Sequence, residues 1–269
     1  MLEPLQFEFF VRALLGVSLI ALLCGVVGCF VVLRGLSYIG DAIAHAVFPG
    51  LVGAFLLKLD YYLGGLVAAV LTAFGIGWVV QKGGLKQDAA IGTVFVGMFA
   101  LGVVMLSKTQ TYSVDLAHLL VGDPLGISTT DILMTALVST LILLALFLLR
   151  KELLLVAFDP IEARVLGLPV ERLNAFLLVL IACTVVLAIQ MVGTVLVVSL
   201  LVTAASSARM LTSRLLPMMG IASLLGVLGG VLGLFASYIL DTPAGATVVL
   251  VNTFSFVLVL VFKRLLGTS

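Results

Sequence analysis

The chain has 269 residues, of which 63% are hydrophobic and only 10% are charged. Soluble domains carry roughly 25% charged residues, so these charges cannot cover a soluble globule of this size, and most of its surface must face lipid. With a net charge of +1, the chain has no bulk electrostatic attraction to nucleic acid, and a nucleic-acid partner is excluded on this ground. Cys24, Cys29 and Cys183 lie inside apolar runs without a CxxC pair, which indicates small buried side chains and no disulfide or soft-metal site.

Apolar segments long enough to cross a membrane follow one another along the whole chain. A helical span needs about 20 apolar residues, and the uncharged runs of that kind are 13–33, 61–81, 89–107, 132–149, 173–208, 215–240 and 242–262. The segment 35–57 is an eighth, interrupted only by Asp41 and His45. As one helix, 173–208 would be about 54 Å long, so we expect it to turn back near Gln190 and Gly193. The sequence therefore predicts an all-α, polytopic membrane protein with about eight to nine transmembrane helices in a single domain, residues 1–269.

The basic residues predict the orientation of these spans. With nine crossings and the C-terminus in the cytoplasm, eleven of the fourteen Lys and Arg residues fall on the inner side. Only Arg12, Lys58 and Lys108 then lie outside. Because cytoplasmic loops carry an excess of Lys and Arg, we expect this orientation, with an external N-terminus.

A short charged segment, "FDPIEARVLGLPV" (158–170), follows the cytoplasmic end of the uncharged run 132–149. Asp159 is a good N-cap with Pro160 at the first helical position, and Gly167 is expected to end the helix. One interpretation is an ordinary solvated connector, and the other is a docking helix for a cytoplasmic motor subunit. The chain has no G-x-x-x-x-G-K-[ST] motif, so a separate subunit would have to bind ATP.

Asp41 and His45 are ionisable residues inside a predicted membrane span, where such residues are rare unless they have a role. Four residues apart on a helix, they share one face and present an oxygen and a nitrogen that suit Mn²⁺, Fe²⁺ or Zn²⁺. An ionisable group at bilayer depth is costly and is tolerated where it faces a cavity or a partner. Two alternatives remain open: Asp41 caps the span while His45 bonds a neighbouring helix, or the pair relays protons.

The second histidine of the chain also has an aspartate close to it in the sequence. Asp115 and His118 are three residues apart in the predicted external segment 113–128. They predict either an external entry site for the metal or an ordinary loop.

The stretch "VVLRGLSYIGDAIAHAVFPGLVGAFLL" (31–57) resembles the zinc, manganese and iron permeases of bacterial ABC importers. Members carry an arginine followed by a G-D-A-[IL]-[AS]-H-[AS]-V-x-P-G segment at this place. Further resemblance follows in the same order along the chain, at 89–105, 114–128, 158–170, 192–211 and 240–250. One departure is Ala205, where many members have proline.

The resemblance implies a fold similar to type II ABC importers and a multi-pass subunit in the bacterial cytoplasmic (inner) membrane. It implies a homodimer, a cytoplasmic ABC ATPase, and an extracellular or periplasmic protein that delivers the metal. By position, Asp41 and His45 fall on the metal path. Asp159, Glu162, Ala163 and Gly167 fall on the coupling helix near 158–170, where Glu162-Ala163-xxx-Gly167 matches the coupling loop.

The predicted function is the permease subunit of an ATP-driven importer of Mn²⁺ or Zn²⁺, or of Fe²⁺. It performs no covalent chemistry and holds no permanent cofactor, and the ATP is bound by its partner. The absence of a cysteine near the path and of a histidine-rich loop favours manganese slightly. The alternatives are a secondary transporter driven by an ion gradient, and an ABC permease for a metal chelate.

Overall fold

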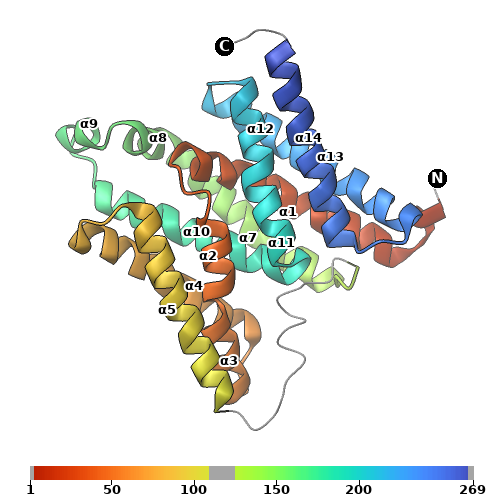
Figure 1. Ribbon diagram of the computed structural model, residues 1–269, viewed down its shortest axis with the longest axis horizontal. Helices are drawn as coiled ribbons and strands as arrows, with labels where there is room; N and C mark the ends of the chain where they lie inside the picture. The colour runs from red at the N-terminus through yellow and green to blue at the C-terminus, as the bar shows by residue number, and fades with distance from the viewer. Residues whose placement is uncertain (1–2, 109–124, 266–269) are drawn as a thin grey trace. The chain divides into compact units, whose positions relative to one another are not determined.

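The computed structural model describes residues 3–108 and 125–265, and it is helical in nearly all of them (Figure 1). Nine helices within these ranges are long and apolar enough to cross a membrane, which confirms the predicted all-α membrane fold. The bounds are η1 (Glu3–Gln6), α1 (Glu8–Leu33), α2 (Ile39–Ala46), α3 (Phe48–Leu57), α4 (Tyr61–Gly83), α5 (Gln87–Ser107), α7 (Thr129–Leu148), α8 (Arg150–Phe158), α9 (Pro160–Val165), α10 (Val170–Val192), α11 (Thr194–Val198), η2 (Ser199–Thr203), α12 (Ala204–Leu211), α13 (Leu215–Leu240) and α14 (Ala244–Leu265).

The second span is an interrupted helix, and one long apolar run is divided into two spans. In the second span, α2 ends at Ala46 and α3 begins at Phe48, because Pro49 has no N–H to donate to the carbonyl of His45. The long apolar run after Pro169 is divided at Gly193, whose φ of +80° ends α10 before α11 begins. The predicted break near Gln190 and Gly193 is therefore confirmed, and residues 170–211 form two spans.

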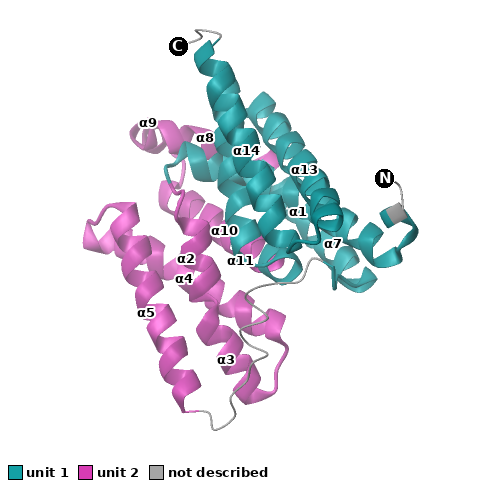
Figure 2. Ribbon diagram, turned by 45° about the vertical axis from the view of Figure 1, so that its right-hand side comes forward, with its two compact units in different colours: residues 1–35, 121–146, 188–269 teal, residues 36–120, 147–187 magenta. Residues whose placement is uncertain are grey.

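The chain divides into two compact units, which Figure 2 colours separately. Unit 1 comprises residues 1–35, 121–146 and 188–269, and its centre is α1 packed against α13. Glycines allow this close approach: a Cβ on Gly25 would collide with the backbone of Ser223, and a Cβ on Gly230 would collide with Val17. The Ser223 hydroxyl donates to the Leu22 carbonyl at 3.2 Å. Small residues and interhelical hydrogen bonds are how membrane helices associate, because lipid gives them no hydrophobic advantage.

A π-helical segment, η2, is also part of unit 1 and lies against α1. The Leu201 carbonyl oxygen approaches Gly28 so closely that a Cβ there would overlap it. On the other side of α13, Gly229 gives room to the Asn252 side chain and Gly233 to Val248, both on α14. Unit 1 is thus a layered bundle whose helix contacts depend on single glycines.

Unit 2 comprises residues 36–120 and 147–187, and so contains α2 to α5, α8, α9 and most of α10. Its α3 and α4 meet at Gly50 and Gly64, each of which would clash with the backbone of the other if it carried a Cβ. Gly102 of α5 lies directly against Phe48 and Pro49. These contacts place α5 beside both halves of the interrupted second span.

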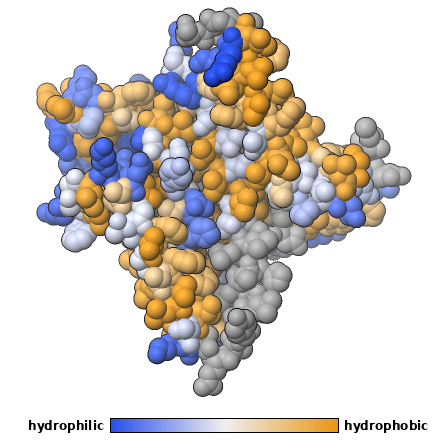
Figure 3. All heavy atoms as spheres, viewed as in Figure 1, coloured by the Kyte–Doolittle hydropathy of each residue, from blue (hydrophilic) through white to orange (hydrophobic). Residues whose placement is uncertain are grey.

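The outer surface is apolar along most of the helices. Figure 3 shows apolar side chains over most of one face, with hydrophilic side chains gathered near helix ends and a small hydrophilic group over α2. Of the most apolar 18-residue window of each span, 67% is buried for α1 but only 11% for α14. Side chains exposed in this way need lipid or protein around them, so the chain is a multi-pass membrane protein.

Candidate functional site

The helix α2 brings Asp41 and His45 together as predicted. His45 Nε2 lies 3.5 Å from Asp41 Oδ1, so the two side chains share one helical face and converge. Two ligand bonds of about 2.1 Å at an angle of about 90–110° separate their donor atoms by roughly 3.0–3.5 Å. The pair is therefore spaced to share one cation with little movement.

Asp41 does not cap its helix, contrary to one of the alternatives left open by the sequence. The N-cap of α2 is Tyr38, and no side-chain hydrogen bond caps it. Asp41 is the third residue of the helix, and its side chain is 53% exposed, against 36% for His45. A carboxylate that satisfies no backbone donor at the helix start remains available to a ligand.

Two phenyl rings from α5 flank the imidazole of His45. The Phe95 ring centroid is 5.9 Å from the His45 centroid, and that of Phe99 is 6.0 Å away in an edge-to-face arrangement. Phe48 supports Phe99 from α3, with centroids 5.8 Å apart. With the rings on its other side, a polar ligand reaches the imidazole from the side of Asp41.

The contacts of Phe95 and Phe99 with the histidine were not predicted from the sequence. Their spacing of four residues shows that they share a face of α5. This shared face was the only signal in the sequence that the two rings act together. Which helix that face contacts depends on how Gly102 packs against Phe48 and Pro49, and local sequence does not contain that information.

Asp41 and His45 form a pair rather than a complete metal site. Within residues 3–108 and 125–265, no group of three or more His, Cys, Asp or Glu side chains could hold a metal ion. A divalent transition metal takes four or more ligands, so the described His, Cys, Asp and Glu side chains do not complete such a site by themselves. Asp115 and His118 lie outside the described residues, so the external pair stays a prediction.

The segment 158–170 forms the short capped helix that the sequence predicted. The Asp159 carboxylate accepts hydrogen bonds from the N–H groups of Ile161 and Glu162, at 3.0 and 2.8 Å. Gly167 has φ +79°, and the next residue, Leu168, donates its N–H to the Ala163 carbonyl at 3.0 Å. The helix α9 therefore has an acidic N-cap and a left-handed glycine at its end.

One face of α9 is anchored and the other is open. Ala163 is fully buried, whereas Ile161 is 73% and Val165 is 82% exposed. Arg164 is held to Glu171 at 2.9 Å, which connects α9 to the start of α10. A small rigid helix with exposed apolar side chains has the form of a docking element.

Comparison with known proteins identifies relatives of this chain. The model of the family described as ABC 3 transport family matches residues 6–263. A manganese transport system membrane protein, MntC, of Halalkalibacterium halodurans is 39% identical over 261 residues, which cover 97% of this chain and 89% of that protein. A chelated iron transport system membrane protein, YfeD, of Yersinia pestis is 36% identical over 263 residues, covering 98% and 88%.

A solved structure agrees with this relationship. PsaBC from Streptococcus pneumoniae, in complex with a Fab, contains a chain that is similar to this one with a TM-score of 0.84 and 36% identity. The match covers 96% of this chain and 93% of that chain. These findings confirm the family that the motif around Asp41 and His45 predicted.

Proposed function

The chain belongs to the ABC 3 transport family, and from that premise we propose that Asp41 and His45 carry a divalent metal through an ATP-driven importer. The chain is the membrane-spanning permease subunit of a metal transport system, in line with relatives named for manganese and for chelated iron. The observation that carries the proposal is the convergence of Asp41 and His45, 3.5 Å apart, inside the second span.

The pair acts as a transient set of ligands. The Asp41 carboxylate lowers the cost of moving a divalent cation out of water, and neutral His45 adds a nitrogen ligand. Two protein ligands hold the ion too weakly to trap it, which suits a substrate that must leave again. Phe95 and Phe99 restrict the orientation of the imidazole.

A second copy of the chain completes the path. The Asp41 and His45 side chains are 53% and 36% exposed within a membrane span, where a polar side chain facing lipid is costly. Two copies related by a two-fold axis would shield both pairs from lipid. A homodimer therefore explains the exposure of these side chains.

The driving force comes from a partner, since the chain contains no ATP-binding loop motif. We infer that a cytoplasmic ABC ATPase binds the open face of α9 and moves unit 2 through Asp159, Glu162, Ala163 and Gly167. A metal-binding protein on the external side delivers the ion. Between them, the ion crosses by alternating access without covalent chemistry on this chain.

Manganese is the cargo that we propose. Asp and His ligands suit Mn²⁺ and Zn²⁺ alike, and intrinsic affinity favours zinc at almost any such site. The cysteines that a zinc site often uses lie in apolar segments; Cys24 and Cys29 are buried and Cys183 is half-buried. Relatives named for manganese support the same choice.

The test measures metal in cells. A strain that lacks the gene should lose cell-associated manganese, and the wild-type gene should restore it. His45→Ala should abolish the restoration while dimer assembly and ATPase association stay intact. Normal uptake by His45→Ala would rule out the assignment, and His118→Ala tests the predicted external pair separately.

The same variant tests the chelate alternative, which the relative named for chelated iron supports. A chelate hides its metal inside its own ligands, so its passage would not need a protein imidazole. Uptake of an iron chelate that His45→Ala leaves unchanged, without any manganese uptake by the wild type, would favour that alternative.

A further inference from the structure

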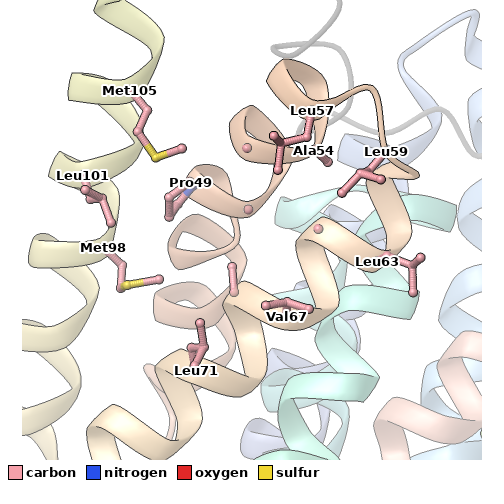
Figure 4. Close-up of a pocket in the computed structure, with 14 residues that line it drawn as sticks. Pro49, Ala54, Leu57, Leu59, Leu63, Val67, Leu71, Met98, Leu101 and Met105 are labelled. Carbon is pink, nitrogen blue, oxygen red and sulfur yellow. The ribbon is translucent and has the colours of Figure 1, made fainter.

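An apolar groove runs along α3, α4 and α5 of unit 2, separate from the metal path. Its volume is about 340 Å³, within the range of small-molecule sites. Figure 4 shows side chains of α4 on one side and methionines of α5 on the other, with Pro49 and Ala54 of α3 between them. Neither Asp41 nor His45 lines it; the lining residues are Pro49, Gly50, Gly53, Ala54, Leu57, Leu59, Leu63, Gly64, Val67, Ala68, Leu71, Met98, Leu101 and Met105.

The groove is elongated in the direction of the helices. Its α4 side extends from Leu63 to Leu71, and eight residues of helix rise about 12 Å. Its α5 side extends from Met98 to Met105, and this length of helix is about 10 Å. Because these helices span the membrane, the groove lies alongside lipid chains rather than across them.

One end of the groove has the residues typical of a membrane interface. The helices α3 and α5 run in the same direction, since Gly102 meets Pro49 and Gly53 meets Met105. They therefore end on the same side of unit 2, at Lys58 and Lys108, and both lysines are exposed. Tyr61 and Tyr62 begin α4 at this end, and tyrosines gather at the level of lipid headgroups.

Among the described residues at this end, the two lysines outnumber the one acid close to them, Asp60. Asp60 is the N-cap of α4, where it accepts the N–H of Leu63 at 3.1 Å. Lys58 occupies a left-handed backbone conformation, φ +53°, which glycine would adopt at lower cost. Glycine also fits this conformation, so the charge of Lys58 can be removed without forcing the backbone.

We propose that this groove binds one acyl chain of an anionic phospholipid whose phosphate contacts Lys58 and Lys108. The apolar walls accept hydrocarbon, the length accommodates the upper half of a chain, and the two cations select the headgroup. The lipid fills the gap between α5 and the pair α3 and α4, which Asp41 and His45 do not line.

Two substitutions separate the acyl chain from the headgroup. A Cβ at Gly53 would meet only the Met105 methyl, at 3.6 Å, so Gly53→Leu fits the helix and projects into the groove. Lys58→Gly removes a charge and relieves the backbone, so it should not weaken the fold. Gly220→Leu is the matched control, because a Cβ at Gly220 has no neighbour within 4 Å and the residue does not line the groove.

The experiment uses the full-length permease with its ATPase in phosphatidylcholine vesicles. The probe is phosphatidylglycerol with a photoactivatable diazirine on one acyl chain, and mass spectrometry maps the labelled peptides. We expect labels in 49–71 and 98–105. Gly53→Leu should reduce them about tenfold, because the leucine side chain takes up the space of the acyl chain and overpacking an apolar site is costly. Lys58→Gly and Lys108→Ala should each reduce them about fivefold, and Gly220→Leu should leave them unchanged.

Three results would overturn the proposal. Equal labelling by a phosphatidylcholine with the same diazirine chain would refute selection of the headgroup. Labelling that Gly53→Leu leaves unchanged would refute occupation of the groove. Absence of labelling, together with a disulfide between Val67→Cys copies, would show that a second permease covers the groove instead. None of these results depends on metal transport.

Discussion

At the residue scale, His45 has one polar and one aromatic side. Asp41 lies 3.5 Å from its Nε2 atom, while Phe95 and Phe99 flank the ring from α5. An imidazole on a lone helix could rotate about two torsions and lose its alignment with Asp41. The phenyl rings limit that rotation, so they position the histidine without binding the ion themselves.

Replacing Phe99 by leucine should impair this positioning while keeping the contact apolar. An edge-to-face aromatic pair contributes about 0.5–1.5 kcal/mol beyond its buried area, so we expect KM for manganese uptake to rise about three- to tenfold. The maximal rate should change less. Uptake measured against external manganese gives both values.

Phe254→Leu is the matched control, since Phe254 is 63% exposed on α14 and should show wild-type kinetics. An unchanged KM in Phe99→Leu would mean that the ring only fills space. Restoration of the wild-type KM by Phe99→Tyr would support the aromatic role.

The residues of this site differ in how far the sequence could predict them. Asp41 and His45 are four apart, and the helical period alone places them on one face. The contact between His45 and Phe99 joins residues 54 positions apart in the chain, and it depends on the packing of Gly102 against Pro49. No local pattern contains that information, so the aromatic side of the site appeared only in the structure.

At the element scale, the short helix α9 is held by caps at both ends, and the side chains on its outer face are exposed. Asp159 satisfies two N–H groups at its start, and Gly167 closes its end. All of this was predictable, because caps are local: an acidic residue before proline, and glycine after the last turn. The exposure of Ile161 and Val165 was not, since six residues show no reliable amphipathic period.

Val165→Asp should disrupt docking of the ATPase without disturbing α9. Val165 is 82% exposed, so the substitution costs the permease little, whereas a carboxylate buried in an interface is strongly unfavourable. We expect the ATPase retained by the purified permease to fall more than about tenfold. Co-purification from membranes measures it.

Leu85→Asp provides the comparison for that experiment. Leu85 is 45% exposed between α4 and α5, in another loop that the charge pattern assigns to the cytoplasm. The Leu85→Asp permease should retain the ATPase. If Val165→Asp retains as much ATPase as Leu85→Asp, then α9 is a solvated connector.

The break between α10 and α11 provides a separate prediction about stability. Gly193 has φ +80° and ψ 167°, a region essentially reserved for glycine. Gly193→Ala should therefore cost about 1–3 kcal/mol in the free energy of unfolding. Thermal unfolding in detergent should show a lower midpoint, whereas Gly220→Ala should not, since it lies in helix with open space around its Cα. An unchanged midpoint in Gly193→Ala would show that the turn can relax.

At the scale of the whole molecule, the membrane fold followed from the sequence because hydropathy sets the spans. About 20 apolar residues cross the bilayer, and the eight apolar segments, one of them divided by the expected break near Gly193, account for the nine spans that the described residues contain. The division of the chain into two units did not follow. It depends on which helices meet at glycines such as Gly25 and Gly64, and apolar helices of similar composition do not reveal their partners.

The last prediction concerns the proposed dependence of transport on a separate ATPase. The chain contains no G-x-x-x-x-G-K-[ST] motif, and on the proposed function purified permease in vesicles should take up no manganese above the rate of empty vesicles. Adding the ATPase, the external metal-binding protein and ATP should start uptake, and a non-hydrolysable ATP analogue should not support it. Metal trapped inside the vesicles measures the transport. Uptake by the permease alone, driven by an imposed proton or sodium gradient, would instead identify a secondary transporter. In that case the open face of α9 would require a different partner.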